Sequence, residues 1–365
     1  MMTKKEQTMA QIKTKMHEGT ATPLHGFAIL LSVVAAVVVV IFGIGIGSVY
    51  IPPGELIHIV SHKLFGFVLP SDIDAITVSL VWKLRLPRVL LAFVVGSGLG
   101  ASGTVMQSVL RNPLASSYTL GVSAGAALGA GVIIITGFTL PFLGYLTLPA
   151  VGLLSGMLTV YIAVKFASKM DRNMSNNTII LAGMVFSLFI NAILTLVSAM
   201  NHEQMQRLLF WQMGSFSLKD WSHVTIMTPI TLVGILFLIR YARELDMIVF
   251  GDEQAQSMGV NVKKIKWILL GLSAALTGSA VAFSGIIGFI DLIAPHVTRK
   301  VFGASHRLVV PISALFGGTF LVLADLVART LISPSELPVG AVTALIGAPF
   351  FAWVYFGRAR KGASI

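Results

Sequence analysis

The sequence is dominated by long apolar runs that contain no charged side chain. Phe27–Tyr50 and Val89–Leu110 are uncharged, and so is the whole stretch from Asn112 to Val164. A helix needs about 20 apolar residues to cross a hydrocarbon core of about 30 Å. The first two runs are each long enough for one crossing, and the third is long enough for two. These runs predict an integral membrane protein.

Further apolar segments continue to the C-terminus. One of them, Gly288–Val301, is short and interrupted by Asp291, His296 and Arg299; counting it gives ten crossings. We therefore predict an all-α integral membrane protein with about ten transmembrane helices. The remaining predicted spans are Thr178–Met200, Val224–Ile239, Trp267–Ile290, Leu308–Ile332 and Leu337–Gly357.

Small residues recur at the spacing that brings helices together. Gly96 and Gly100 are four residues apart, and Gly121, Gly125 and Gly129 continue the same spacing in the next span. In lipid, such faces let helix backbones approach closely. The bundle is therefore expected to be tightly packed.

The charge distribution predicts the orientation of the chain. Only 11% of residues are charged, against about 25% in a soluble domain. Ten crossings with the N-terminus inside place most of the 26 lysines and arginines on the cytoplasmic side, as the positive-inside rule requires. This predicts a multi-pass membrane protein with both termini cytoplasmic. Its parts are a tail at 1–22, a transmembrane domain at 23–357 and a tail at 358–365.

Several catalytic and cofactor motifs are excluded by their context. Gly98–Gly103 fits a dinucleotide fingerprint but lies in a predicted span without a preceding strand, and Gly121–Gly125 fits a nucleophile elbow in a similar position. No phosphate-binding loop with its lysine is present, and the absence of cysteine excludes thiolate metal sites. No basic patch is interleaved with aromatics, so we expect no nucleic acid partner. We expect no enzymatic activity, catalytic residue, metal or cofactor on this chain.

A few ionisable residues lie at membrane depth, where they usually have a function. Asp325 and Arg329 are four residues apart on one predicted helix, so they are expected to pair. Asp291 has Arg299 or a neighbouring helix as a candidate partner. One interpretation of these residues is an ion-coupled secondary transporter that uses Asp291, Asp325 and His296.

The loop at Tyr241–Lys266 is predicted to contain two short helices that meet at Gly251. Met247, Ile248 and Phe250 form an expected apolar projection beside Asp252 and Glu253. Exposed apolar side chains with a charged rim indicate a protein contact. The alternative is interfacial anchoring on lipid.

The order of motifs resembles a known family. Leu84-Arg85-Leu86-Pro87-Arg88, then Arg111-Asn112-Pro113-Leu114-Ala115, then Leu120–Ala126 are similar to the FecCD-type permeases of iron–siderophore, haem and vitamin B12 ABC importers. The C-terminal third continues the likeness, which extends from about Phe27 to Gly357. The family motifs there include Pro113, Pro295, His296, Arg299, Asp325, Pro338 and Gly340.

The resemblance implies a type II ABC importer permease of the bacterial cytoplasmic membrane that carries an iron(III)–siderophore complex, with 23–357 as its transmembrane permease domain. It implies a homodimer or a heterodimer with a paralogous permease, two ATPase subunits that use ATP, and an extracytoplasmic substrate-binding (lipo)protein. It also implies roles for three groups of residues. Arg85, Arg88 and Arg329 would dock the binding protein; Met247, Phe250, Gly251, Asp252, Glu253 and Gly259 in the coupling helices at 245–260 would contact the ATPases; and Asn112, Leu114, Asn176 and Asn177 would form the cytoplasmic gate.

The sequence departs from the family at three places. Asp291 stands where the family usually has glycine, Ser116-Ser117 stands where an acidic residue commonly follows the Asn-Pro-Leu-Ala turn, and Asn176 and Asn177 replace small hydroxyl residues. The second, third and fifth spans are uncharged and rich in small residues. We interpret them as the wall of a path that offers a bulky chelate no tight site.

Overall fold

The computed structural model describes residues 23–47 and 49–362, so the predicted tail at 1–22 and residues 363–365 lie outside the described part. Within that part the ten predicted crossings are all helices. Seven are long and apolar enough to cross a membrane, α6 and the Val339–Trp353 part of α16 are shorter apolar segments, and α14 is the interrupted segment. The ten are α2 (Pro23–Gly45), α5 (Leu86–Val109), α6 (Val122–Thr136), α7 (Thr147–Met170), α8 (Asn176–Ala199), α10 (Trp221–Arg240), α13 (Val262–Ser284), α14 (Ile290–Phe302), α15 (His306–Thr330) and α16 (Val339–Gly362).

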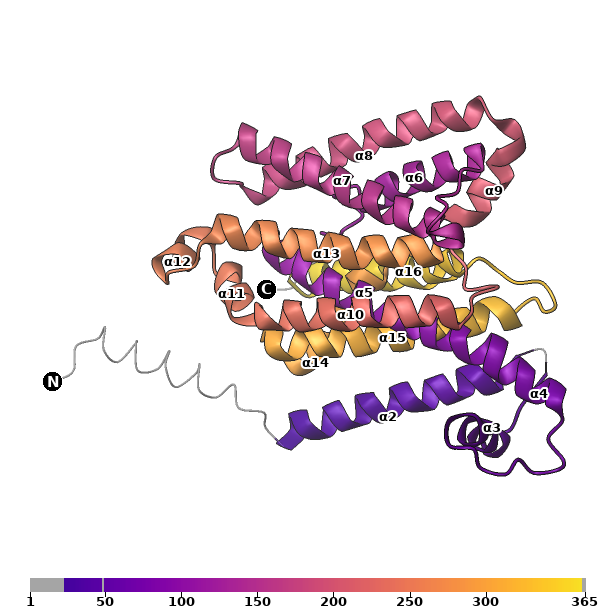
Figure 1. The fold of residues 1–365 in the computed structure, drawn as a ribbon. Helices are drawn as coiled ribbons and strands as arrows, with labels where there is room; N and C mark the ends of the chain where they lie inside the picture. The colour runs from indigo at the N-terminus through magenta and orange to yellow at the C-terminus, as the bar shows by residue number, and fades with distance from the viewer. Residues whose placement is uncertain (1–22, 48, 363–365) are drawn as a thin grey trace.

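Shorter helices lie at the two ends of the bundle. At one end, which we call the α11–α12 end, are α11 (Ala242–Val249), α12 (Asp252–Ser257) and the turn between α7 and α8 (Figure 1). At the other, the α3–α9 end, are α3 (Pro53–Phe65), α4 (Ala75–Ser79) and α9 (His202–Gln212). α11 and α12 confirm the two short helices expected around Gly251. α3 and α9 are additional elements that the hydropathy pattern does not predict.

α5 is the central helix of the subunit. It continues α4 and a π-helical segment (Leu80–Arg85), and Pro87 explains the wider turn because it has no N–H to donate to the preceding turn. Every residue from Val95 to Leu110 is buried, with α10, α13, α14 and α15 packed around it. The interpretation of this second span as a pathway wall is therefore wrong. Its small residues serve helix contacts inside the subunit.

The small-residue faces make the expected close contacts. A Cβ on Gly96 would overlap the carbonyl of Gly317 on α15, and one on Gly100 would overlap the carbonyl of Ser313. On α6, Gly125 and Gly129 face α7 in the same way. Because lipid provides no hydrophobic force between helices, these contacts hold α5 against α15 and α6 against α7.

Replacing Gly96 with alanine tests this packing. The added methyl meets backbone of α15, so we expect a destabilisation of about 1–3 kcal/mol or more. The matched control is Gly271→Ala on α13, where a Cβ has open space and the change is expected to be neutral or stabilising by about 0.5–1 kcal/mol. Melting temperatures of the purified protein in detergent measure both. Equal melting temperatures for the two variants would contradict the packing described.

Candidate functional site

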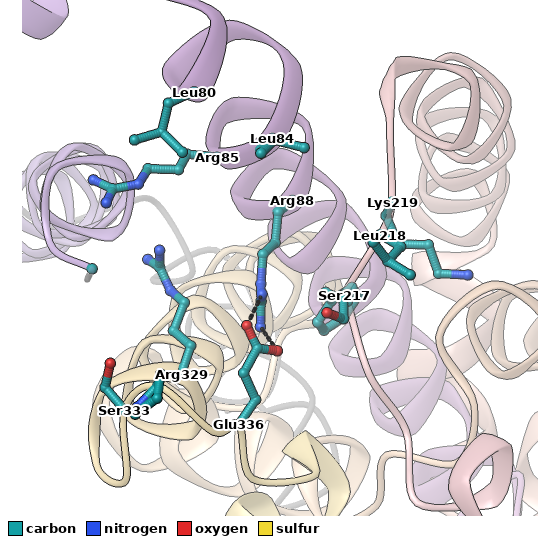
Figure 2. Close-up of a pocket in the computed structure, with 13 residues that line it drawn as sticks. Leu80, Leu84, Arg85, Arg88, Ser217, Leu218, Lys219, Arg329, Ser333 and Glu336 are labelled. Atoms are coloured by element: carbon teal, nitrogen blue, oxygen red, sulfur yellow. Dashed lines mark hydrogen bonds and ion pairs between the residues drawn. The ribbon is translucent and has the colours of Figure 1, made fainter. Parts of the chain in front are cut away.

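A cavity of about 360 Å³ opens at the α3–α9 end and brings together the three arginines predicted to dock a partner. Arg85 comes from the π-helical segment, Arg88 from the first turn of α5 and Arg329 from the last turn of α15 (Figure 2). Glu336, in the loop before α16, extends toward Arg88 from below in this view, and Lys219 points away from the arginines. The cavity is therefore rich in cations, although each arginine has partners within the chain.

Arg85 holds the end of α2. Its side chain is only 5% exposed, and its guanidinium donates to the carbonyls of Ile44, Gly45 and Val49 at 3.2, 3.0 and 2.6 Å. The last carbonyls of a helix have no partner within the helix, so a cation is favourable there. Arg85 thus attaches the end of α2 to the start of α5. The sequence gives no signal for this role because the acceptors are backbone atoms.

Arg88 is the centre of an ion-pair network. Its Nη2 lies 2.9 Å from Asp325, which is 1% exposed, and its Nη1 lies 2.7 Å from Glu336. The predicted Asp325–Arg329 pair also forms, with Nε of Arg329 3.6 Å from the carboxylate. Arg329 further donates to the carbonyl of Gly43 on α2. The network ties α2, α5, α15 and the loop before α16 together.

The carboxyl of Glu336 stays ionised in this network. Burial acts to raise the pKa of Glu336, but hydrogen bonds and charge from Arg88 outweigh it and hold the pKa below its usual value.

Two residues of the family motifs come shortly after Glu336 in the sequence. Pro338 precedes α16, and Gly340 donates to the carbonyl of Met213 at 3.1 Å where a Cβ would crowd that atom.

The α11–α12 end carries the predicted apolar projection, but its exposed residues are not all the expected ones. Phe250 is 74% exposed between the two helices, and Val249 is exposed beside it, whereas Ile248 is fully buried. The prediction that Ile248 belongs to the exposed surface is therefore wrong, because it packs into the core. Gly251 has φ 128°, a value that only glycine adopts readily, and separates α11 from α12. Met247 is half-buried, Asp252 and Glu253 begin α12, and Gly259 (φ 89°) follows it.

The residues assigned to the gate lie in two turns at this same end. Asn112 accepts a hydrogen bond from the N–H of Leu114 at 2.9 Å, which closes the turn that contains Pro113. Asn176 is the first residue of α8 and is buried, whereas Asn177 is exposed. Asp171 orders the turn that precedes α8. Hydrogen bonds donated by Ser175, which have the largest effect, and by Asn173 lower the pKa of the Asp171 carboxyl to about 2.

The intramembrane ionisable residues do not form a chain. Arg299 donates to Gln107 at 2.6 Å and to Ser108 at 3.1 Å, so of the two candidate partners of Asp291, Arg299 or a neighbouring helix, Arg299 is not the partner. Asp291 is buried beside Ser116 and Tyr118, and its carbonyl contacts α5 at Gly103. Asp325 contacts α5 at Arg88, about 22 Å away along a helix that rises 1.5 Å per residue. Pro295 and His296 lie on α14, between Asp291 and Asp325 in the sequence.

Comparison with known proteins identifies the family. Residues 35–356 match the FecCD transport family. The chain belongs to this family. It is an ABC importer permease and a multi-pass membrane protein, and the family consists of transport permeases.

The relatives extend over most of the chain. An uncharacterised ABC transporter permease of Bacillus subtilis is 40% identical over 89% of this chain and 92% of its own. The hemin transport system permease of Yersinia pestis is 42% identical over 75% of this chain and 82% of its own. A solved structure described as an inward-facing conformation of a metal-chelate type ABC transporter is 30% identical, with a TM-score of 0.79 over 91% of this chain and 99% of that one. Further relatives at 32–36% identity are named for cobalamin, molybdate and Fe(3+)-citrate import.

Replacing Asp325 with asparagine tests the ion-pair network. Arg88 and Arg329 would lose a buried counter-charge, and breaking such a pair costs about 3–5 kcal/mol. Glu336→Gln is the matched control, because Glu336 is 36% exposed and its pair is worth about 1 kcal/mol or less. Thermal unfolding in detergent is the measurement. A larger loss of stability in Glu336→Gln than in Asp325→Asn would contradict the assignment of Asp325 as the central partner.

Proposed function

We propose that this chain forms the membrane pathway for an iron(III)–siderophore complex, in an importer driven by two ATPase subunits. The observation that carries the proposal is the separation of two different surfaces at opposite ends of one bundle. The arginine-lined cavity lies at the α3–α9 end, and the exposed Phe250 lies beside the gate turns at the α11–α12 end. The α3–α9 end suits the docking of an acidic partner protein, and the α11–α12 end suits contact with ATPase subunits.

We assign the α3–α9 end to the extracytoplasmic side, where a substrate-binding protein would dock. Arg88 and Arg329 are partly neutralised within the chain, yet the three arginines together outnumber Asp325 and Glu336 around the cavity. Acidic residues of a binding protein would be attracted to this excess positive charge and oriented by it. Arg85 would contribute charge while it stays bonded to α2.

We assign the α11–α12 end to the cytoplasm, together with both termini. Phe250 and Val249 would enter a groove on each ATPase, with Asp252 and Glu253 at the rim. A large aromatic side chain that becomes buried in a partner is typical of residues that dominate binding energy. ATP would be used by those subunits, and the permease would work as a homodimer or with a paralogous partner.

The iron–siderophore cargo is supported by the surface of α8. This helix is largely unburied in the single chain, and Asn191 and Thr195 are exposed on it, whereas charged side chains are absent from Asn176–Ala199. An uncharged wall of this kind binds weakly enough to release a bulky chelate. Two relatives are named for the transport of iron complexes, hemin and Fe(3+)-citrate.

Uptake of radiolabelled iron tests the proposal and its cargo. Cells that express the chain with its neighbouring transport subunits are expected to take up ferric hydroxamate or catecholate siderophores, and an excess of cobalamin or molybdate should not compete.

Replacing Phe250 with aspartate should abolish uptake, because the loss of a central aromatic contact of about 2 kcal/mol or more uncouples ATP hydrolysis from the permease.

The matched control is Phe65→Asp, a change of an equally exposed phenylalanine at the α3–α9 end. It is expected to leave ATP hydrolysis coupled to uptake. If Phe250→Asp keeps full iron uptake per ATP, the ATPase surface has been assigned to the wrong place. If cobalamin or molybdate displaces the iron complex completely, the cargo is wrong while the importer remains.

A further inference from the structure

Lys266 is the most deeply buried charged side chain near the gate. It lies in the first turns of α13 and is fully buried. Its Nζ donates to the carboxylate of Asp252 at 2.6 Å, to the side-chain oxygen of Asn176 at 2.8 Å and to the carbonyl of Met174 at 3.0 Å. Its three donors are thus used by three acceptors.

Burying an ammonium group is costly unless its charge and its donors are satisfied. The acceptors that satisfy Lys266 come from two separate segments. Asp252 begins α12, whereas Met174 and Asn176 belong to the turn that starts α8. Lys266 therefore joins the coupling helix to one half of the proposed gate through atoms that are all within 3.0 Å of its Nζ.

Asp252 also faces the other half of the gate. Its second carboxylate oxygen lies 3.6 Å from Nη2 of Arg111, in the turn that leads to Asn112 and Leu114. One carboxylate on α12 thus contacts Arg111, which belongs to one gate turn, and Lys266 of α13, which is hydrogen-bonded to the other gate turn.

α11 is attached to a different part of the bundle. Its Asp246 accepts a hydrogen bond from the ring of His306 at 2.6 Å, and the other ring nitrogen of His306 lies 2.6 Å from Ser108 on α5. This second network leads to the buried core around α5 and α15. Because Gly251 separates the two helices, α12 can move relative to α11 while α11 stays fixed to the core.

We propose that Lys266 is a positioning residue that transmits displacement of α12 to the start of α8, with Asp252 as its partner on the moving helix. The inference rests on the proposed function, in which the ATPase subunits bind at Phe250 and contact Asp252 and Glu253 at the start of α12; their movement would then displace α12 about Gly251. When α12 shifts, the Asp252 carboxylate pulls on the Lys266 ammonium, and the hydrogen bonds from that ammonium carry Asn176 and Met174 with it. Loss of the ammonium would leave ATP hydrolysis intact and disconnect it from the gate.

Cysteine labelling at the gate tests the proposal, and the chain suits it because it has no cysteine of its own. Asn177→Cys places one exposed thiol at the start of α8. The permease is assembled with the ATPase that co-purifies from native membranes and reconstituted in nanodiscs. Maleimide labelling rates are compared without nucleotide, with ATP, and with ATP and vanadate, and ATP hydrolysis is measured on the same samples.

We expect nucleotide to change the labelling rate by about fivefold or more in Asn177→Cys alone, the lower end of typical coupling between sites. Adding Lys266→Met should abolish this change while ATP hydrolysis continues, and Asp252→Asn should reduce it. The matched control is Lys263→Met, which removes an exposed lysine from the same turn and should behave as Asn177→Cys alone.

Three outcomes separate the inference from the function on which it rests. Full nucleotide-dependent labelling in a folded Lys266→Met assembly would overturn the inference and leave the proposed function standing. If Lys266→Met does not fold, Asp252→Asn decides in the same way, since it retains an acceptor for Lys266. If Asn177→Cys alone shows no response to nucleotide or binds no ATPase, the proposed function fails first, and the inference fails with it.

Discussion

The whole structure depends on the close contact of α5 with the helices around it. Gly96 and Gly100 bring its backbone against α15, and Gly103 brings it against α14. In lipid these contacts replace the hydrophobic force that would hold a soluble core. The two candidate functional regions lie at opposite ends of this helix, with Arg88 in its first turn and Arg111 just beyond its last. A buried helix of 24 residues, about 36 Å long, separates them.

Three buried or partly buried cations lie near the ends of the bundle, and each is hydrogen-bonded or ion-paired to other elements of the chain. Arg85 bonds the carbonyls that end α2, Arg88 joins α15 to the loop before α16, and Lys266 joins α12 to α8. A cation removed from water needs every donor satisfied. The same contacts therefore fix how the helix ends sit relative to one another. Such multi-element contacts are suited to change together when one element is displaced.

Much of this architecture can be predicted from the sequence, because spans are uncharged over lengths that only a membrane requires. The break between helices at Gly251 and the close helix contact at Gly96 can also be predicted from the sequence, since local composition determines both. The partners of Arg85 are not, because backbone carbonyls leave no trace in side-chain patterns. The expected exposure of Ile248 is wrong for a related reason: a short apolar run does not reveal which of its members faces the core.

Lys266 illustrates the same limit. It resembles the exposed Lys263 and Lys264 beside it in composition, and only its position shows the difference. It follows buried Val262 by four residues and precedes buried Leu269 by three, which places it on the inner face of α13. For the acidic residues of the ion-coupled alternative, the sequence suggests a functional link that the structure does not contain. Asp291 and Asp325 could form a proton relay if they lay close together, but they contact α5 at well-separated positions.

The central claim is that this chain is a gated pathway that depends on partner subunits for energy. Transport by the purified permease alone in proteoliposomes is the most direct measurement, with a ferric siderophore as cargo and proton or sodium gradients imposed in either direction. The account predicts no accumulation under any gradient, and uptake only after the ATPase, the binding protein and ATP are added. Accumulation by the permease alone in response to an ion gradient would contradict it.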